Sequence, residues 1–206
     1  STEDKVGILE YNKVGPTIAD DIKKDSFWAV LGSLVVVFLY ILLRFRRWQF
    51  SLGAVAAVFH DVLIVLGIFS LTYQFMPFNM EIDQSFIAAI LTVIGYSLND
   101  TVVVFDRIRE FMKEYGTSRK MGLIINQAIN STISRTLNTS MTTLIVLLAI
   151  FIFGGASIMG FMFALIVGVL VGTYSSIFIA TPVMFDTIQK KALKPEKQKE
   201  EEEPVA

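Results

Sequence analysis

The sequence predicts an all-α integral membrane protein that folds as a polytopic helix bundle. Hydrophobic residues make up 53% of its 206 residues and charged residues only 18%, which is too apolar for an ordinary soluble domain. Five apolar segments are long enough to cross a bilayer core of about 30 Å, which takes roughly 20 helical residues. Lysine and arginine gather in alternate connections between these segments. The predicted spans are 26–44, 52–73, 85–106, 134–154 and 157–186.

The first two spans differ in polarity. The first is apolar and is bordered by Trp28 and Trp48, which suit the two membrane interfaces. The second carries Asp61 near its middle, beside His60, the only histidine of the chain. Two roles stay open for His60, a proton relay or a local polar cap between helices. One histidine and no cysteine offer too few ligands at useful spacing, so we expect no metal site.

The third span places an acid inside an apolar run. The stretch GYSLNDTVVVFDRIRE follows SFIAAILTVI, so Asn99 and Asp100 come well before the charged end of the segment. An ionised carboxylate is costly inside a bilayer and usually marks an ion path or a buried pair. We therefore favour a functional role for Asp100. The alternative is a structural acid that neighbouring hydroxyls such as Ser97 or Thr101 satisfy.

The fourth span is too polar to cross on its apolar part alone. Residues 144–153 are too few, so the preceding stretch SRTLNTSMTT must also lie at membrane depth. A polar stripe on one helical face of this stretch is predicted to point into protein; it consists of Arg135, Asn138, Thr139 and Thr142. Arg135 and Asp100 lie near the inner ends of neighbouring antiparallel spans, so we expect them to meet. Alternatively, Arg135 extends to lipid phosphates.

Small residues recur at every fourth position of the fifth span. This pattern is typical of closely packed membrane helices, and its members are Gly160, Ala164, Gly168, Gly172, Ser176 and Ala180. We predict that this face packs against neighbouring helices, although a smooth face also permits sliding. Pro182 is expected to kink or end the span.

The positions of lysine and arginine predict the orientation, because positively charged loops stay in the cytoplasm. These residues gather in 44–47, 107–120 and 190–194, whereas 74–84 and 154–157 contain none. Residues 1–25 are then external, and we expect them to be the tail of a periplasmic domain that a further helix precedes. Residues 187–206 are charged and are predicted to form a disordered cytoplasmic tail. Residues 26–186 form the transmembrane bundle.

Four motifs resemble the SecF family, including the SecF half of fused SecDF proteins. They are VGPTIADDI at 14–22, HDVLIVLGIFSL at 60–71, GYSLNDTVVVFDRIRE at 95–110 and SRTLNTS at 134–140. One position differs, since the family often has glycine where this chain has Ala19. The resemblance implies five of the six transmembrane helices of a resistance-nodulation-division (RND) type half, preceded by the remnant of a truncated periplasmic domain, in the bacterial cytoplasmic membrane.

The resemblance also implies a function. SecF-like subunits use the proton-motive force to assist the export of preproteins, working with SecD, SecY, SecE, SecG and often YajC. Protons and membrane lipid are the other expected partners. The candidate proton-coupling residues are Asp100, Arg135, Asp61 and His60, and the supporting polar residues are Asn99, Ser97, Asn138 and Thr139. We expect no enzyme activity and no cofactor, and the formal net charge of -1 argues against nucleic-acid binding.

Two other classes compete with this interpretation. Half of a proton-driven RND exporter of small molecules or lipids would also carry buried acids, although the third motif favours SecF. A membrane enzyme such as an intramembrane hydrolase needs a nucleophile with a base, or a metal, and His60 alone supplies neither.

Overall fold

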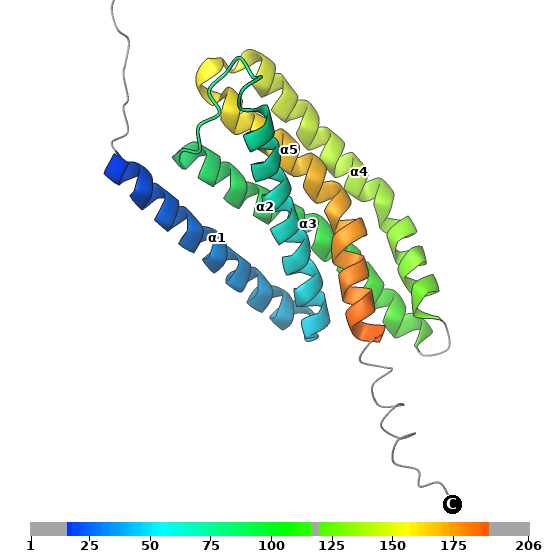
Figure 1. The fold of residues 1–206 in the computed structure, drawn as a ribbon. Coiled ribbons are helices and arrows are strands. Elements are labelled where there is room, and N and C mark those ends of the chain that lie inside the picture. The colour runs from blue at the N-terminus through cyan, green and yellow to red at the C-terminus, as the bar shows by residue number, and fades with distance from the viewer. Residues whose placement is uncertain (1–15, 117–119, 190–206) are drawn as a thin grey trace, which may run out of the picture.

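The computed structural model describes residues 16–116 and 120–189, with side chains from Lys24 onward. Within these residues every regular element is helical, and five helices are long and apolar enough to cross a membrane (Figure 1). The predicted fold class is therefore confirmed. The helices are α1 (Pro16–Phe45), α2 (Trp48–Thr72), α3 (Gln84–Tyr115), α4 (Met121–Phe153) and α5 (Met159–Ser175), with a 3-10 turn at Ala156–Ile158 and a π-helix at Ser176–Ala180.

Several helices extend beyond the predicted spans. Helix α1 begins at Pro16, inside the segment 1–25 that we assign to an external tail. Helices α3 and α4 take up most of the segment 107–133, because buried residues such as Ile108 and Ala128 continue the apolar face of each helix. The last helix runs to residue 189, so the predicted tail 187–206 lies mostly outside the described residues.

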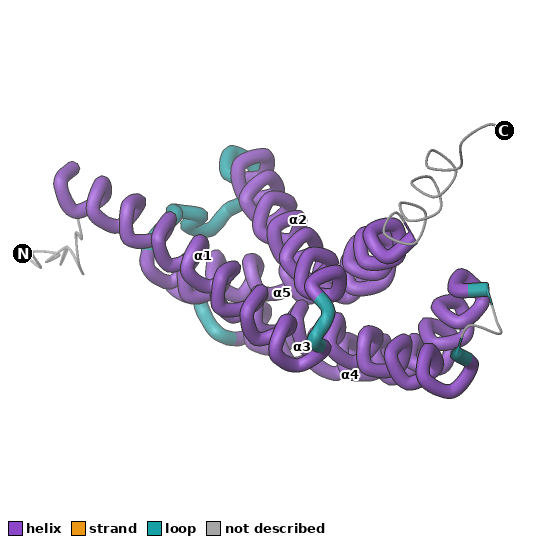
Figure 2. Tube along the Cα trace, turned by 90° about the horizontal axis from the view of Figure 1, so that it is seen from below, coloured by secondary structure: helices purple, strands orange, loops and turns teal. Residues whose placement is uncertain are grey.

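Three helices form the interior of the bundle, and two further helices flank it. Helix α3 contacts each of the other four, and α5 packs against α2, α3 and α4. Helices α1 and α4 lie on opposite flanks (Figures 1 and 2). In the most apolar stretch of each span, 44% of the residues are buried in α2, α3 and α5, but only 11% in α1 and 17% in α4. Both flanking helices thus leave broad faces uncovered by the described chain.

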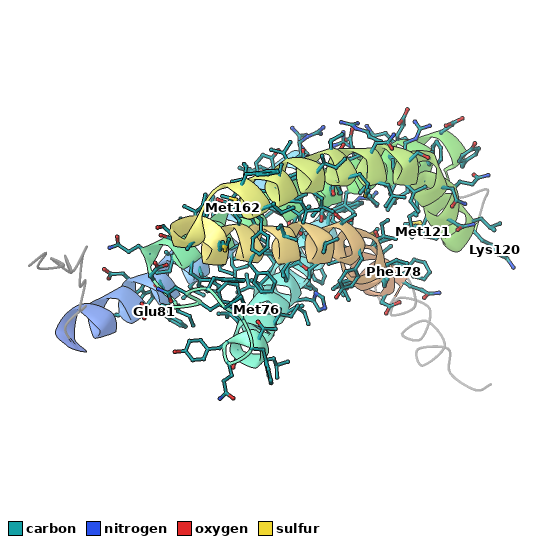
Figure 3. All side chains as sticks on the ribbon, turned by 90° about the horizontal axis from the view of Figure 1, so that it is seen from above. Met76, Glu81, Lys120, Met121, Met162 and Phe178 are labelled. Atoms are coloured by element: carbon teal, nitrogen blue, oxygen red, sulfur yellow. The ribbon has the colours of Figure 1, made fainter. Side chains whose placement is uncertain are left out.

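The two ends of the bundle differ in charge. Figure 3 shows Met76 and Glu81 near one end and Lys120 with Met121 at the other. We call the second the basic end, because the helix ends and turns that meet there carry Arg44, Arg46, Arg47, Arg107, Arg109, Lys113 and Lys120.

Two glycines of the small-residue face let α5 approach α3 closely. A Cβ atom on Gly168 would overlap the side chain of Val93, and one on Gly172 would lie 3.0 Å from Ser97 Cβ. A Cβ atom on Gly160 would overlap the carbonyl oxygen of a loop residue, Asn79. The remaining members of the face are completely buried: Ala164, Ser176 and Ala180.

The last helix widens before Pro182 and does not end there. The π-helix Ser176–Ala180 precedes the proline, and α-helical geometry then continues through residues 181–189. Proline has no backbone N–H and its ring crowds the carbonyl four residues earlier, and a π-bulge relieves this conflict locally. Thr181 Oγ1 donates to the Ser176 carbonyl over 3.1 Å, which adds a bond across the widened turn.

Candidate functional site

Asp61 of α2 is completely buried where α2, α3 and α5 meet. Its Oδ2 accepts hydrogen bonds from Ser97 Oγ of α3 over 2.5 Å and from Ser175 Oγ of α5 over 2.9 Å. Its Oδ1 lies 3.2 Å from Nδ1 of the adjacent His60. Because an ionised carboxylate only accepts hydrogen bonds, this set of donors suits the charged form. Ser97, considered above as a partner of Asp100, thus serves the other acid.

His60 connects Asp61 to the outer surface of the bundle. Its Nε2 lies 2.7 Å from the Tyr174 hydroxyl, and the two rings meet edge to face. Tyr174 is 39% exposed, so this chain of contacts begins at the surface of the described chain and ends at a buried acid. With its proton on Nδ1, His60 donates to Asp61 and accepts from Tyr174. Both roles left open for His60 fit this geometry.

Asp100 of α3 is also buried, but it has a much poorer set of donors. Its one hydrogen-bond partner among the described residues is Ser140 Oγ of α4, 3.5 Å from Oδ2, and that distance is long for such a bond. The same hydroxyl lies 2.7 Å from Thr173 Oγ1 of α5, and Thr173 donates to the Val169 carbonyl over 2.6 Å.

The number of available protons limits how many hydrogen bonds this chain of hydroxyl groups can make. Each hydroxyl has one proton to donate. When Asp100 is ionised, Ser140 and Thr173 have two protons for three contacts, namely Asp100–Ser140, Ser140–Thr173 and Thr173–Val169, so one contact is left without a proton. A protonated Asp100 donating to Ser140 completes the chain, whereas an ionised Asp100 breaks it. The two buried acids therefore differ in their surroundings: two serine hydroxyls contact Asp61 at 2.5 and 2.9 Å, whereas Asp100 has one contact at 3.5 Å.

The expected meeting of Arg135 with Asp100 is not found in this structure. Within the described part of the chain, no acid oxygen lies within 4.0 Å of a side-chain nitrogen of Arg135, whose side chain is exposed. Arg135 is on the opposite side of α4 from Ser140, which is the α4 residue that contacts Asp100.

The polar stripe on α4, predicted to point into protein, is not covered by the described part of this chain. Asn138 and Thr142 are exposed and Thr139 is partly buried. The hydroxyl residues of α4 that turn inward are spaced four apart: Thr132, Thr136 and Ser140. Helical periodicity identifies both stripes, but a threonine is easier to bury because it can bond to its own helix, as Thr132 does to the Ala128 carbonyl.

Sequence reasoning missed four residues of the site: Ser140, Thr173, Tyr174 and Ser175. The last three are consecutive on α5 and contact three different members of the site, namely Ser140, His60 and Asp61. A signal for them exists, because the polar run TYSS at 173–176 interrupts an otherwise apolar span. The side chain of Asn99, in contrast, is exposed and makes no hydrogen bond to either acid among the described residues.

Comparison with known proteins identifies the family. The family model described as protein export membrane protein SecD/SecF, C-terminal, matches residues 1–190. The chain belongs to the SecD/SecF family. It is 56% identical over 179 residues to the protein translocase subunit SecF of Rhodothermus marinus, with 87% of this chain and 58% of that relative covered. This SecF-family chain therefore spans little more than half the length of that relative.

Fused members of the SecD/SecF family match as well. The protein translocase subunit SecDF of Brucella abortus is 46% identical over 171 residues, which is 83% of this chain and 22% of that protein. The crystal structure of SecDF from Thermus thermophilus superposes with a TM-score of 0.77 at 40% identity, covering 85% of this chain and 23% of that one. The SecF resemblance and the bundle architecture are thus confirmed together.

Proposed function

We propose that this SecF-family chain is the membrane bundle of a protein translocase subunit that uses the proton-motive force to assist preprotein export, together with SecD and SecYEG. The relatives described above are protein translocase subunits, which favours export of preproteins over the alternative of an RND exporter of small molecules or lipids. The bacterial cytoplasmic membrane is the proposed location.

The observation that carries this proposal is the hydroxyl chain at Asp100. When Asp100 is ionised, Ser140 can donate to the acid and still contact Thr173 only if Thr173 gives up its bond to the Val169 carbonyl, so one bond of the chain is lost. When Asp100 takes up a proton, the carboxyl group donates to Ser140 and all three helices are linked. Each protonation state thus favours its own arrangement of the helices, and a proton gradient can bias such a two-state element.

Asp61 has a different part in the proposed mechanism. Ser97 and Ser175 donate to Asp61 and so join α2 to α3 and α5, and His60 adds a third donor when its proton is on Nδ1. We therefore propose that Asp61 holds these three helices together while α4 moves relative to them. The Tyr174–His60 contact links Asp61 to an exposed side chain of the bundle, and we assign to it the path by which Asp61 exchanges protons. Under this assignment Asp100 exchanges protons in every cycle, whereas Asp61 and His60 support it.

Arg135 supports a role for a partner helix beside α4. Arg135, Asn138 and Thr142 form an exposed polar stripe on a flanking helix, and polar groups at membrane depth are unfavourable against lipid. We assign the cover of this stripe to SecD, or to the SecD half of the same chain. Arg135 would then place its charge at the boundary between the two halves.

Gradient-dependent export is the direct test. The full-length protein is reconstituted with SecD, SecYEG and its ATP-driven motor, and preprotein export is measured with and without a proton gradient. Asp100→Asn offers Ser140 a permanent donor, as the protonated acid does, but cannot exchange a proton, so it should assemble and lose the stimulation by the gradient. Glu110→Gln is the matched control, an exposed acid of the same helix. Full stimulation in Asp100→Asn would move the coupling role elsewhere.

A further inference from the structure

A strongly basic cavity opens at the basic end of the bundle, where α1, α2 and α3 meet. Its volume is about 400 Å³, and five of its eight lining residues are cations. The lining consists of Arg44, Phe45, Arg46, Arg47, Phe50, Arg109, Met112 and Lys113. It lies apart from both buried acids, and the proposed function makes no use of it.

The floor of the cavity is rigid and aromatic. Phe45 stacks on Phe50 with ring centroids 5.1 Å apart, and both rings pack edge-on against the buried Phe105. The guanidinium groups of Arg44 and Arg109 lie 5.5 and 5.4 Å from the centre of the Phe45 ring. Such cation–π contacts hold an arginine flat while its N–H groups stay available at the edge.

One acid fixes these two arginines without neutralising the cavity. Asp106 Oδ1 lies 3.2 Å from Arg44 Nη2 and 3.1 Å from Arg109 Nη2, and Arg109 Nη1 donates to the Arg44 carbonyl over 3.1 Å. The other three cations of the lining, Arg46, Arg47 and Lys113, have no ion-pair partner in the part of the chain that the structure describes. The cavity therefore keeps a large positive excess.

The turn that carries two of these cations is conformationally unusual. Arg46 has a φ angle of 56°, the left-handed region that non-glycine residues rarely adopt. Glycine or asparagine would fit this position with less strain. A long basic side chain at such a position is not explained by the backbone, and it agrees with a role for the side chain itself.

We propose that this cavity binds the phosphate group of an anionic phospholipid. Planar guanidinium groups match phosphate oxygens, and several cations on one rim offer more donors than a single phosphate needs. Basic pockets between membrane helices on the cytoplasmic side are suited to acidic lipid headgroups. The phosphate would join the end of α1 and the start of α2 to α3 at the membrane surface.

The surroundings favour a lipid over a soluble phosphate. Leu43 and Trp48, close in sequence to the lining arginines, are 78% and 45% exposed. An exposed leucine offers a surface for an acyl chain, and an exposed tryptophan next to a cationic cluster is typical of the headgroup region. Phe50 and Met112 add apolar atoms to the lining itself, which a phospholipid can contact and an inorganic anion cannot.

The test measures lipid retention and does not depend on export. The full-length protein in its complex is placed in phosphatidylcholine nanodiscs with added phosphatidylglycerol, and retained lipid is counted by native mass spectrometry. Arg46→Asn removes a cation with a residue that accepts the left-handed backbone, and Lys113→Gln removes one from an exposed helix position. Each should weaken phosphatidylglycerol retention about fivefold. Phosphatidylcholine should not compete.

Arg107→Gln is the matched control, because Arg107 is on the same helix but pairs with Glu110 and does not line the cavity. It should retain phosphatidylglycerol like the unmodified protein. Equal retention in Lys113→Gln and Arg107→Gln would overturn the proposal, even if Arg46→Asn disturbed the turn. Inorganic phosphate is added in a separate arm, and displacement of the lipid by this anion would show that the cavity takes a soluble ligand.

Discussion

Ser175 and Asp61 are joined by a 2.9 Å hydrogen bond between α5 and α2. Two residues earlier on α5, Thr173 bonds to Ser140, which in turn contacts Asp100. The two buried acids are therefore connected through a single turn of α5, directly before the π-helix Ser176–Ala180. A change in the hydrogen bonding of one acid can reach the other through this turn.

Removing the Ser175 hydroxyl should destabilise the bundle. Ser175→Ala deprives a fully buried carboxylate of one of its donors, so the free energy of unfolding should fall by about 1–3 kcal/mol. Denaturant titration of the purified protein measures this change. Thr92→Ala is the control, since Thr92 is exposed and bonds only to its own helix; it should change stability by less than about 0.5 kcal/mol. Equal stabilities would mean that Asp61 does not need this donor.

A methyl group on Gly168 should force α5 away from α3. Gly168→Ala places a Cβ atom inside the side chain of Val93, and overpacking of this kind costs about 1–3 kcal/mol. Gly67→Ala is the matched control, because the added group meets no atom within 4 Å beyond its own turn of helix. There alanine should stabilise the helix by up to about 1 kcal/mol. Thermal unfolding of the two variants should shift in opposite directions, and a shared direction would contradict this account of the packing.

Cysteine labelling can test the predicted orientation. The chain has no cysteine of its own, so Glu81→Cys and Lys120→Cys introduce single sites at opposite ends of the bundle (Figure 3). In sealed spheroplasts an impermeant maleimide should label Glu81→Cys at once and Lys120→Cys only after the membrane is opened. The reverse order would invert the orientation, and labelling of both sites from one side would exclude it.

Cross-linking can test what covers α4. A cysteine at Asn138, on the exposed polar stripe, should form a cross-link to SecD or to the SecD half when the full-length complex is treated with a short bifunctional reagent. Val36 is exposed on α1, on the opposite flank, and a cysteine there should not form the same product. Products from Val36 alone, with none from Asn138, would mean that the stripe on α4 faces lipid.

The sequence alone determined the membrane class, the approximate positions of all five helices and the presence of two acids at membrane depth. These features depend on local properties. The length of an apolar run and the side-chain chemistry within it can be read without any partner. The spacing of Gly168 and Gly172 also predicted a close helix contact, because a four-residue repeat lies on one face of a helix.

Only the tertiary structure decided which polar groups meet. Helical periodicity gave α4 two polar stripes, and packing turned the hydroxyl stripe toward Asp100 and left Arg135 outside. Periodicity likewise could not assign Ser97 to Asp61, since that bond depends on the rotation of α3 against α2. The rotation and separation of helices are set by how side chains pack across several elements at once. The sequence of one helix alone does not specify which neighbouring side chains it will meet.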